Sequence, residues 1–418
     1  MGRKDITLID LTNKVDCLEL LVNHNGTQKV LKFNPHWLRF NCQSDKSREP
    51  STGQRTVPIK NVPTNLKIKS AARDGDFVKI VWDELSNQSD SLLSIKFLLN
   101  NSPSLNAIDF DKRYETVDDL CFFDFNEFVS KEIRNEDKIF DWMKYLAEYG
   151  LCVVKNVPNR ENMVRNLVEL VAPLEKTIYG EIFDVKVDVN PVNLAYSAAP
   201  LEFHNDLVYY ESPPGIQFLH CLKFDESVVG GETLFVDGFQ VAEKFRRDHP
   251  RLFDVLTKIP ASFQKIHNHR GRKIFIQHSK PHIVLNHRQK IIGVNWGPAN
   301  EGPLRNLTED EVKAYYEAYL EFYKAVNDES NITAIRLNPG EVVCFNNRRF
   351  FHSRNGFKQP KGSRHFQGCY LTMDEFKSEV LAREYTRNNR DKDLVINQSV
   401  DISSLHLLNT NVGNNDYN

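Results

Sequence analysis

The fold is decided by a stretch in the middle of the chain that reads Gly215-Ile216-Gln217-Phe218-Leu219-His220-Cys221-Leu222-Lys223-Phe224. Successive side chains of such a segment point to opposite faces of a sheet, so the stretch predicts a β-strand. Further short strands are predicted at Leu151 to Val154, Thr233 to Val236 and Glu341 to Phe345. Apolar residues recur at helical spacing at Asn135 to Glu148, Asn162 to Ala172 and Thr308 to Val326.

Many strands and few helices between Leu151 and Thr372 indicate a mainly β protein with peripheral helices. A double-sheet jelly roll is one architecture of this kind. The last of the predicted helices begins with a capping-box pattern, because Thr308 is followed three residues later by Glu311.

The first hundred residues predict a small β-rich domain. Strands are expected at Leu18 to Val22, Gln28 to Phe33 and Phe77 to Trp82, and Asn25-Gly26 is a hairpin signal. A linker at Asn100 to Thr116 separates this domain, 1–105, from a larger one at 117–385. The polar, Asn-rich segment 391–418 is expected to be a disordered tail.

Composition excludes several classes of function. The 418 residues carry a formal net charge of -2 without long basic runs, so we expect no nucleic-acid partner. Apolar stretches fall short of the roughly 18 residues that span a bilayer, so no membrane association is expected. The seven cysteines are scattered without a CxxC pair, which is typical of reduced thiols, and we therefore expect a cytoplasmic protein.

A candidate metal site begins at Phe203-His204-Asn205-Asp206. On an extended segment His204 and Asp206 share one face, so both can reach one ion. A second histidine completes the two-His, one-carboxylate set of non-haem Fe(II) oxygenases, and His352, which follows a predicted strand, is the candidate. With 13 histidines and 56 acidic residues in the chain, the pair is also compatible with a surface turn.

Two further residues fit a co-substrate of this chemistry. Arg364 lies twelve residues after His352, and its guanidinium could bind the distal carboxylate of 2-oxoglutarate in a bidentate manner. Thr233, after Gly230-Gly231-Glu232, could offer a hydroxyl to the same ligand. A surface salt bridge for the arginine and an ordinary strand position for the threonine are the alternative interpretations.

Several short motifs together resemble the γ-butyrobetaine dioxygenase and trimethyllysine dioxygenase family, and more closely γ-butyrobetaine dioxygenase. They cover nearly the whole chain except the tail. They are Trp37-Leu38-Arg39-Phe40-Asn41-Cys42, His204-Asn205-Asp206, Pro213-Pro214-Gly215-Ile216-Gln217, His220-Cys221-Leu222-Lys223, Gly230-Gly231-Glu232-Thr233, Val236-Asp237-Gly238-Phe239, Asn346-Asn347-Arg348 and Arg364 with Gly368-Cys369-Tyr370.

This resemblance implies an oxygenase domain built as a double-stranded β-helix, or jelly roll. It implies dependence on Fe(II), 2-oxoglutarate and ascorbate, and a homodimer. The expected reaction hydroxylates γ-butyrobetaine to L-carnitine while 2-oxoglutarate is decarboxylated to succinate. His204, Asp206 and His352 match the family's iron ligands, and Arg364 matches its co-substrate arginine.

The resemblance also implies a pocket for a small substrate with a trimethylammonium group. An aromatic cage for the cation falls on Tyr179, Phe183, Tyr196 and Tyr370, and Asn193 matches a residue that contacts the substrate carboxylate. Phe183 stands where the family typically has Trp, and a second carboxylate-binding Asn is replaced near Trp296-Gly297-Pro298. Ordinary core packing is the alternative for each single ring.

The N-terminal domain departs from the family in its metal ligands. The family commonly has a zinc site there, but of its cysteines only Cys42 remains, followed by Gln43, Ser44 and Lys46. Tetrahedral zinc needs four ligands, so we expect no structural zinc. The group His267, His269, His278, His282 and His287 fits no compact zinc template, and we expect loop or strand positions, with lining of the site entrance as the alternative.

Three functions therefore compete at the level of sequence. The first is hydroxylation of γ-butyrobetaine. The second is the same chemistry on trimethyllysine or another quaternary-ammonium acid, which the residues Phe183 and Gly297 leave open. The third is a non-catalytic small-molecule-binding protein with a vestigial site, against which the complete ligand set and Arg364 argue.

Overall fold

The structure is a computed structural model that describes residues 6–24, 26–83, 90–103, 120–130, 133–187, 197–269, 272–358 and 363–388. The chain forms two compact units, one made of Met1–Phe110 with Leu381–Asn418 and the other of Asp111–Val380. The predicted tail and most of the predicted linker lie outside the described residues.

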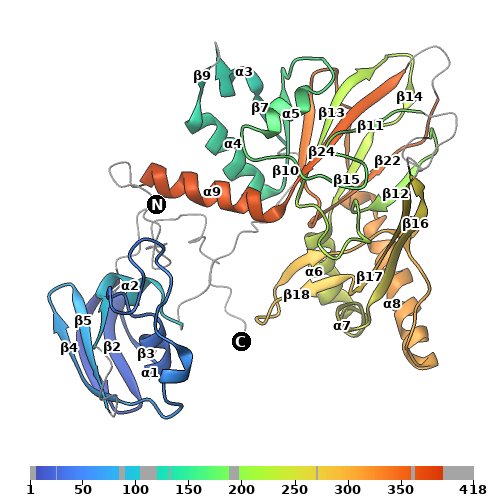
Figure 1. Cartoon of the computed structure of the whole chain (residues 1–418). Coiled ribbons are helices and arrows are strands. Elements are labelled where there is room, and N and C mark those ends of the chain that lie inside the picture. Colours follow the sequence, from blue (N-terminus) through green and yellow to red (C-terminus); the bar gives the residue numbers. More distant parts are fainter. Residues whose placement is uncertain are drawn as a thin grey trace. The chain divides into compact units, whose positions relative to one another are not determined.

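The first unit contains two three-stranded antiparallel sheets (Figure 1). In β2, alternate residues Leu18, Leu20 and Val22 are buried, so one face of the strand builds the core of this unit. The three strands predicted here are confirmed. The elements are β1 (Ile6–Lys14), β2 (Cys17–His24), β3 (Thr27–Phe33), α1 (Pro35–Phe40), η1 (Ile59–Asn61), β4 (Ile68–Asp74), β5 (Phe77–Trp82), β6 (Ser91–Ser94) and α2 (Ile95–Asn100).

The second unit is built on two sheets that face each other. The larger has the strand order β11 (Phe183–Val185), β24 (Arg364–Leu371), β13 (Ile216–Phe224), β21 (Val342–Asn346), β10 (Leu151–Lys155) and β7 (Cys121–Asp124). The smaller has the order β12 (Leu201–His204), β22 (Phe350–Arg354), β15 (Thr233–Asp237) and β20 (Thr333–Ile335). The ring of Phe345 in the larger sheet lies 5.0 Å from that of Phe235 and 5.0 Å from that of His352 in the smaller one.

The central strand β13 is buried on both faces from Ile216 to Cys221. One face turns toward the smaller sheet, and the other is covered by helix α4 (Glu136–Tyr149), whose Trp142 ring lies 6.4 Å from that of Phe218. Asn135 caps the start of the helix, and its side chain accepts a hydrogen bond from the backbone of Lys138. Gly150 caps its end, with a left-handed φ of 80° that favours glycine.

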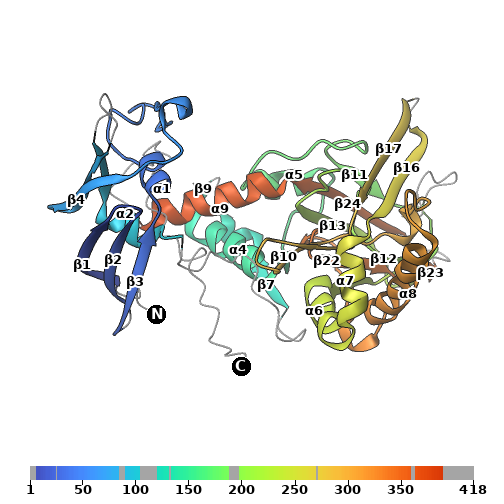
Figure 2. The ribbon, with the colours of Figure 1, turned by 90° about the horizontal axis from the view of Figure 1, so that it is seen from below.

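Three helices cover the outer face of the smaller sheet. They are α6 (Gly238–Asp248), α7 (Pro250–Lys258) and α8 (Glu309–Val326), which lie side by side in Figure 2. The outward-facing Val236 and Phe351 pack into the same apolar cluster as Phe245 and Phe322. The capping box predicted for Thr308 and Glu311 is present at the start of α8, so that prediction is confirmed.

The helix predicted from Asn162 to Ala172 was too long. Helix α5 spans only Met163–Val168. Asn162 has a left-handed φ of 66° and stands outside it. Beyond Val168 the chain forms turns, in which Leu170 N donates to Leu167 O and Val171 N donates to Val168 O. Pro173 follows, and a residue that precedes proline is disfavoured in helical conformation.

The remaining elements are short pieces and hairpins around the two sheets. Figure 2 shows the hairpin of β16 and β17 extending beyond them. No helix in the described ranges is long and apolar enough to cross a membrane. The second unit is thus mostly strands with several helices. Its other elements are α3 (Phe125–Phe128), β8 (Val129–Ser130), β9 (Ile133–Arg134), β14 (Val229–Gly230), β16 (Ala261–His269), β17 (Arg272–Lys280), β18 (Ile283–Leu285), β19 (Ile291–Val294), η4 (Pro298–Asn300), η5 (Glu329–Asn331), β23 (Phe357–Lys358) and the first part of α9 (Met373–Asn388).

Candidate metal centre

A cavity lies between the facing sheets of the second unit. It has about 650 Å³ of empty space, part of it open to solvent, and both sheets contribute to its wall. The structure places eight of the ten residues predicted for the site on this wall, namely Tyr179, Phe183, His204, Asp206, Thr233, His352, Arg364 and Tyr370. The other two, Asn193 and Tyr196, lie outside the described residues.

His204, Asp206 and His352 form one cluster on the cavity wall. One ligand atom from each lies within 4.8 Å of the others. His204 and His352 are directly opposite in the pairing of β12 with β22, which brings their ring centroids to 4.3 Å. Asp206 Oδ1 lies 3.3 Å from Nε2 of His204 and 3.9 Å from Nε2 of His352.

The protonation of this cluster suits a divalent cation. Burial and the neighbouring His204 lower the pKa of His352 to about 3, so its imidazole is neutral at physiological pH. Burial opposes ionisation of Asp206, but the hydrogen bond to His204 and the two imidazoles hold its pKa well below its usual range. Burial opposes charge on His204 as well, yet Asp206 raises its pKa, and a metal ion would take the place of that proton.

The orientation of His204 also fits a metal ligand. Its Nδ1 lies 2.8 Å from the carbonyl oxygen of Glu202, which places the Nδ1 proton on that bond and directs Nε2 into the cluster. Two imidazole nitrogens and a carboxylate oxygen are the donor set that non-haem Fe(II) oxygenases use. The residues present therefore fit an Fe(II) ion.

Arg364 places a buried positive charge on the wall of the same cavity. It is 5% exposed, its Nε donates to the carbonyl oxygen of Gly231 at 3.1 Å, and its guanidinium lies 4.1 Å from the centre of the Phe366 ring. Burial and the charge of Arg354 lower its pKa to about 9, which leaves it charged at neutral pH. No carboxylate of the described residues forms an ion pair with it, so an anionic ligand in the cavity would find a charged donor.

Gln217 and Arg354 are among the cavity residues that sequence reasoning missed. Arg354 lies two residues after His352 on β22, and that spacing alone places both on one face of the strand. It is directly opposite the predicted Thr233 in the pairing with β15. Gln217 stands within a quoted motif, but the motif gives no reason for its role. Its Nε2 donates to Asp206 Oδ2 at 2.7 Å.

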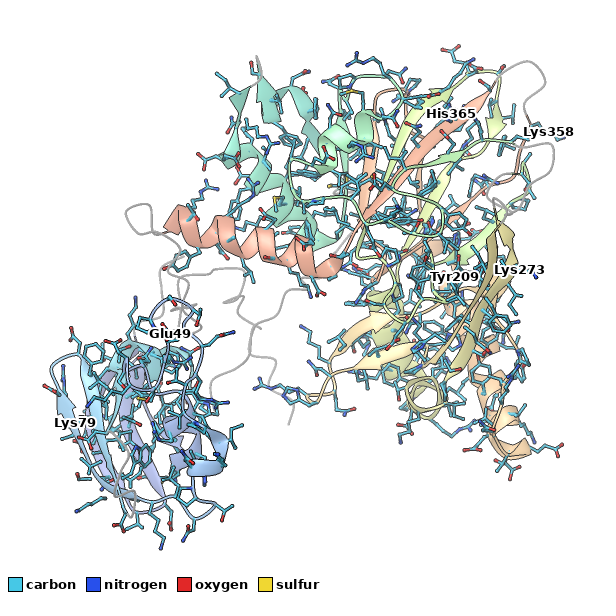
Figure 3. All side chains as sticks on the ribbon, viewed as in Figure 1. Glu49, Lys79, Tyr209, Lys273, Lys358 and His365 are labelled. Atoms are coloured by element: carbon cyan, nitrogen blue, oxygen red, sulfur yellow. The ribbon has the colours of Figure 1, made fainter. Side chains whose placement is uncertain are left out.

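Three of the predicted cage rings form one side of the cavity. Phe183 and Tyr370 stack at 5.2 Å with an interplanar angle of 24°, and Tyr179 lies 6.5 Å from Phe183. The hydroxyl of Tyr179 is within 3.3 Å of that of Tyr209, which Figure 3 labels. Because Phe183 covers one face of Tyr370, that face is closed to a cation.

Gly297 stands where the sequence departs from the family pattern, and the space around it limits any side chain there. A Cβ added there would lie 2.7 Å from Cγ1 of Val208, so a side chain at this position requires that valine to move. Gly297 is not among the residues that line the cavity. The replaced asparagine of the family pattern therefore has no equivalent at this position.

The alternative that the grouped histidines line the site entrance fails for His282. It is buried, with Nδ1 2.7 Å from Asn295 O and Nε2 2.8 Å from Tyr315 Oη. Burial lowers its pKa to about 4, which is typical of a neutral core histidine. In the first unit, Cys42 Sγ lies 3.3 Å from Ser44 Oγ and accepts from Leu92 N at 3.3 Å, and the absence of a structural zinc stays a prediction.

Two facing sheets that enclose two histidines, an aspartate and a buried arginine define the class of Fe(II)- and 2-oxoglutarate-dependent dioxygenases. The model of the taurine catabolism dioxygenase TauD, TfdA family matches residues 124–370. The chain belongs to this family, and γ-butyrobetaine and trimethyllysine dioxygenases are among its relatives.

Individual relatives support this assignment. The chain is 28% identical to a trimethyllysine dioxygenase of Meyerozyma guilliermondii, over 84% of this chain and 90% of that protein. It is 30% identical to dioxygenase str8 of Strobilurus tenacellus, over 82% and 83%. It is 27% identical to the γ-butyrobetaine dioxygenase of Homo sapiens, over 84% and 91%.

Among solved structures, a taurine dioxygenase from Burkholderia xenovorans is similar with a TM-score of 0.45 and 10% identity, covering 64% of this chain and 91% of that one. An asparagine oxygenase has a TM-score of 0.40 and 17% identity, covering 57% and 78%.

Proposed function

We propose that this dioxygenase hydroxylates a small quaternary-ammonium acid, with γ-butyrobetaine as the first candidate and L-carnitine as its product. The observation that carries the proposal is that one cavity holds the His204, Asp206 and His352 cluster, the charged Arg364 and three aromatic rings. Relatives named for γ-butyrobetaine and for trimethyllysine, both trimethylammonium compounds, add support.

In this proposal His204, Asp206 and His352 hold Fe(II), and Arg364 with Thr233 holds the distal carboxylate of 2-oxoglutarate. Bound iron with 2-oxoglutarate supplies the activation of O₂ that is coupled to decarboxylation to succinate. The chain's own residues position the reactants and exclude water. Buried Arg364 binds the carboxylate end through a charge-assisted fork, which orients the keto-acid end toward the metal ligands.

The aromatic side of the cavity would receive the trimethylammonium group. Such a cation cannot donate a hydrogen bond and is attracted to the faces of aromatic rings. Tyr179 and the faces of Phe183 and Tyr370 that their stacking leaves uncovered offer this surface, with Tyr196 as a further expected wall. Asn193 is the proposed contact for the substrate carboxylate.

Trimethyllysine or another quaternary-ammonium acid is the second candidate. Phe183 in place of a Trp, and the steric limit on a side chain at Gly297, change the places where the family recognises the two ends of γ-butyrobetaine. Along with the substrate, we propose a double-stranded β-helix as the fold, with the domain limits given above, ascorbate dependence, a homodimer and a cytoplasmic location.

The decisive experiment measures succinate released from 2-oxoglutarate with γ-butyrobetaine, with trimethyllysine and with no added substrate. We expect release with γ-butyrobetaine, and its loss in His204→Ala. The matched control is His287→Ala, an exposed turn residue, which should keep full release. Equal release by His204→Ala would refute the site. If the anaerobically purified protein contains stoichiometric iron but releases no succinate with either substrate, both named substrates are refuted. Absence of iron would favour a non-catalytic binding protein.

A further inference from the structure

Two side chains bind the same oxygen of Asp206. Gln217 Nε2 and Tyr370 Oη both donate to Oδ2, each at 2.7 Å. The two donors are directly opposite each other in the antiparallel pairing of β13 with β24. Gln217 is 1% exposed and Tyr370 2% exposed, so both donors are buried. Hydrogen bonds to an ionised acceptor in such surroundings are among the stronger ones in proteins.

The other oxygen of Asp206 is the one that faces the histidines. Oδ1 lies 3.3 Å from His204 Nε2 and 3.9 Å from His352 Nε2. The carboxylate is thereby divided, with Oδ2 occupied by the two donors and Oδ1 available to a cation. A carboxylate held in this way can offer one oxygen to a metal rather than two.

The backbone of Asp206 is fixed independently of its side chain. Asn347 is 0% exposed, and its Oδ1 accepts from Asp206 N at 2.8 Å while its Nδ2 donates to Asp206 O at 3.0 Å. Loss of a donor at Oδ2 would therefore leave the main chain in place. The carboxylate alone would become free to rotate about its last side-chain bond.

The orientation of the Gln217 amide supports a role directed at Asp206. Its Oε1 is buried and has no hydrogen-bond partner among the described residues. An unsatisfied buried acceptor destabilises the folded state. The flipped amide would set this oxygen against the carboxylate, so only the observed orientation is attractive. In the observed orientation Gln217 therefore leaves its Oε1 without a partner and donates its N–H to Asp206.

We propose that Gln217 and Tyr370 are positioning residues that hold Asp206 as a one-oxygen metal ligand. This inference rests on the proposed role of His204, Asp206 and His352 as metal ligands. Tyr370 has a second consequence, since its ring stacks on Phe183 on the aromatic side of the cavity. Its hydroxyl and its ring therefore connect the metal carboxylate with the expected substrate pocket.

The test measures binding of Co(II) alone to the full chain, by titration and by the d–d absorption of the bound ion. Gln217→Met keeps the length of the side chain and removes the donor, and Tyr370→Phe keeps the ring and removes the hydroxyl. We expect each to weaken Co(II) binding roughly 10–100-fold, as loss of such outer hydrogen bonds does elsewhere. We also expect an altered absorption spectrum at saturation, which a merely structural role would not produce.

Matched controls are present in the same molecule. Gln367→Met removes a buried glutamine on β24 whose Nε2 donates to Asp184 at 3.0 Å, outside the cavity. Tyr315→Phe removes a buried hydroxyl that contacts His282 at 2.8 Å. Both should bind Co(II) with the affinity and spectrum of the unmodified chain.

The outcomes separate the two proposals. If Asp206→Ala binds Co(II) as the unmodified chain does, the metal site itself is refuted. If Asp206→Ala loses binding but Gln217→Met and Tyr370→Phe keep both affinity and spectrum, the positioning role is refuted and the metal site stands. Should Gln217→Met lack a cooperative thermal transition, Tyr370→Phe decides alone.

Discussion

Phe183 lies directly opposite Gly368 in the pairing of β11 with β24, and its ring occupies the space where a side chain at 368 would stand. An added Cβ at Gly368 would overlap Cζ of that ring. The absence of a side chain at 368 thus lets the ring lie flat on the sheet and stack on Tyr370. One glycine therefore determines the shape of the aromatic side of the cavity.

Gly368→Ala should push the Phe183 ring into the cavity. We expect a loss of about 1–3 kcal/mol in the free energy of unfolding, as for other overpacked cores, and a higher KM for the quaternary-ammonium substrate. Gly293→Ala is the control, because its Cβ would meet nothing closer than 3.8 Å. Equal free energies of unfolding for the two variants would contradict this account. Adding Phe183→Leu should restore part of the stability that Gly368→Ala loses.

Arg364→Lys should raise the KM for 2-oxoglutarate at least about tenfold, since an ammonium cannot reproduce the bidentate fork of a guanidinium. The KM for the proposed quaternary-ammonium substrate should change much less. Arg336→Lys serves as the control. Both guanidinium groups lie over the Phe224 ring, that of Arg364 at 5.3 Å and that of Arg336 at 3.8 Å, but Arg336 pairs with Glu232 away from the cavity wall. An unchanged KM in Arg364→Lys would remove the arginine from co-substrate binding.

Asp237→Asn should destabilise the fold by about 3–5 kcal/mol, because it leaves a buried guanidinium without its carboxylate. Arg349 is 1% exposed, and its NH2 group lies 2.7 Å from Asp237 Oδ2. Because asparagine can still cap the start of α6, the loss of stability reports the missing carboxylate charge alone. The exposed pair of Asp254 and Lys258 gives the control, since Asp254→Asn should change the free energy by about 0.5 kcal/mol or less. Equal denaturation midpoints would contradict the prediction.

Glu301→Gln should stabilise the protein at alkaline pH. Burial raises the pKa of Glu301 from 4.5 to about 7, against the opposing hydrogen bond with Tyr319. The folded state therefore binds the proton more tightly than the unfolded state, and its stability falls as pH rises from about 4.5 through about 7. Since Glu301 is partly exposed, we expect about 1–2 kcal/mol in favour of the variant at pH 8.

The measurement compares melting temperatures at pH 5 and pH 8. The gain of Glu301→Gln over the unmodified chain should be small at pH 5 and several degrees at pH 8. Glu161→Gln, in an exposed loop, controls for the loss of one negative charge. A gain of the same size at both pH values would show that Glu301 does not titrate in this window.

The parts of the fold that depend on local sequence could be predicted. The capping box of Thr308 and Glu311 and the strand that begins at Ile216 are encoded within a few residues, and both are present. The short α5 could not be foreseen from apolar spacing, because the left-handed Asn162 and the turns before Pro173 interrupt the helical pattern.

Within the site, residue type and spacing identified His204 and Asp206, since both lie on one short segment. The role of Gln217 could not be found in this way. It depends on the register that sets Gln217 opposite Tyr370, a residue far along the chain. Alternation along a strand predicts which face a side chain takes, but not which distant residue stands beside it.

Asp206 lies two residues after strand β12 of the smaller sheet, yet its carboxylate is held by Gln217 and Tyr370 of the larger sheet. A bound metal ion would therefore clamp both sheets through one atom. Because ligand binding stabilises only states that keep the whole site, metal should slow amide hydrogen exchange in β12 and β22 and, equally, in β13 and β24. If metal slowed amide exchange in one sheet only, the two sheets would open independently, and the metal centre would not hold them together.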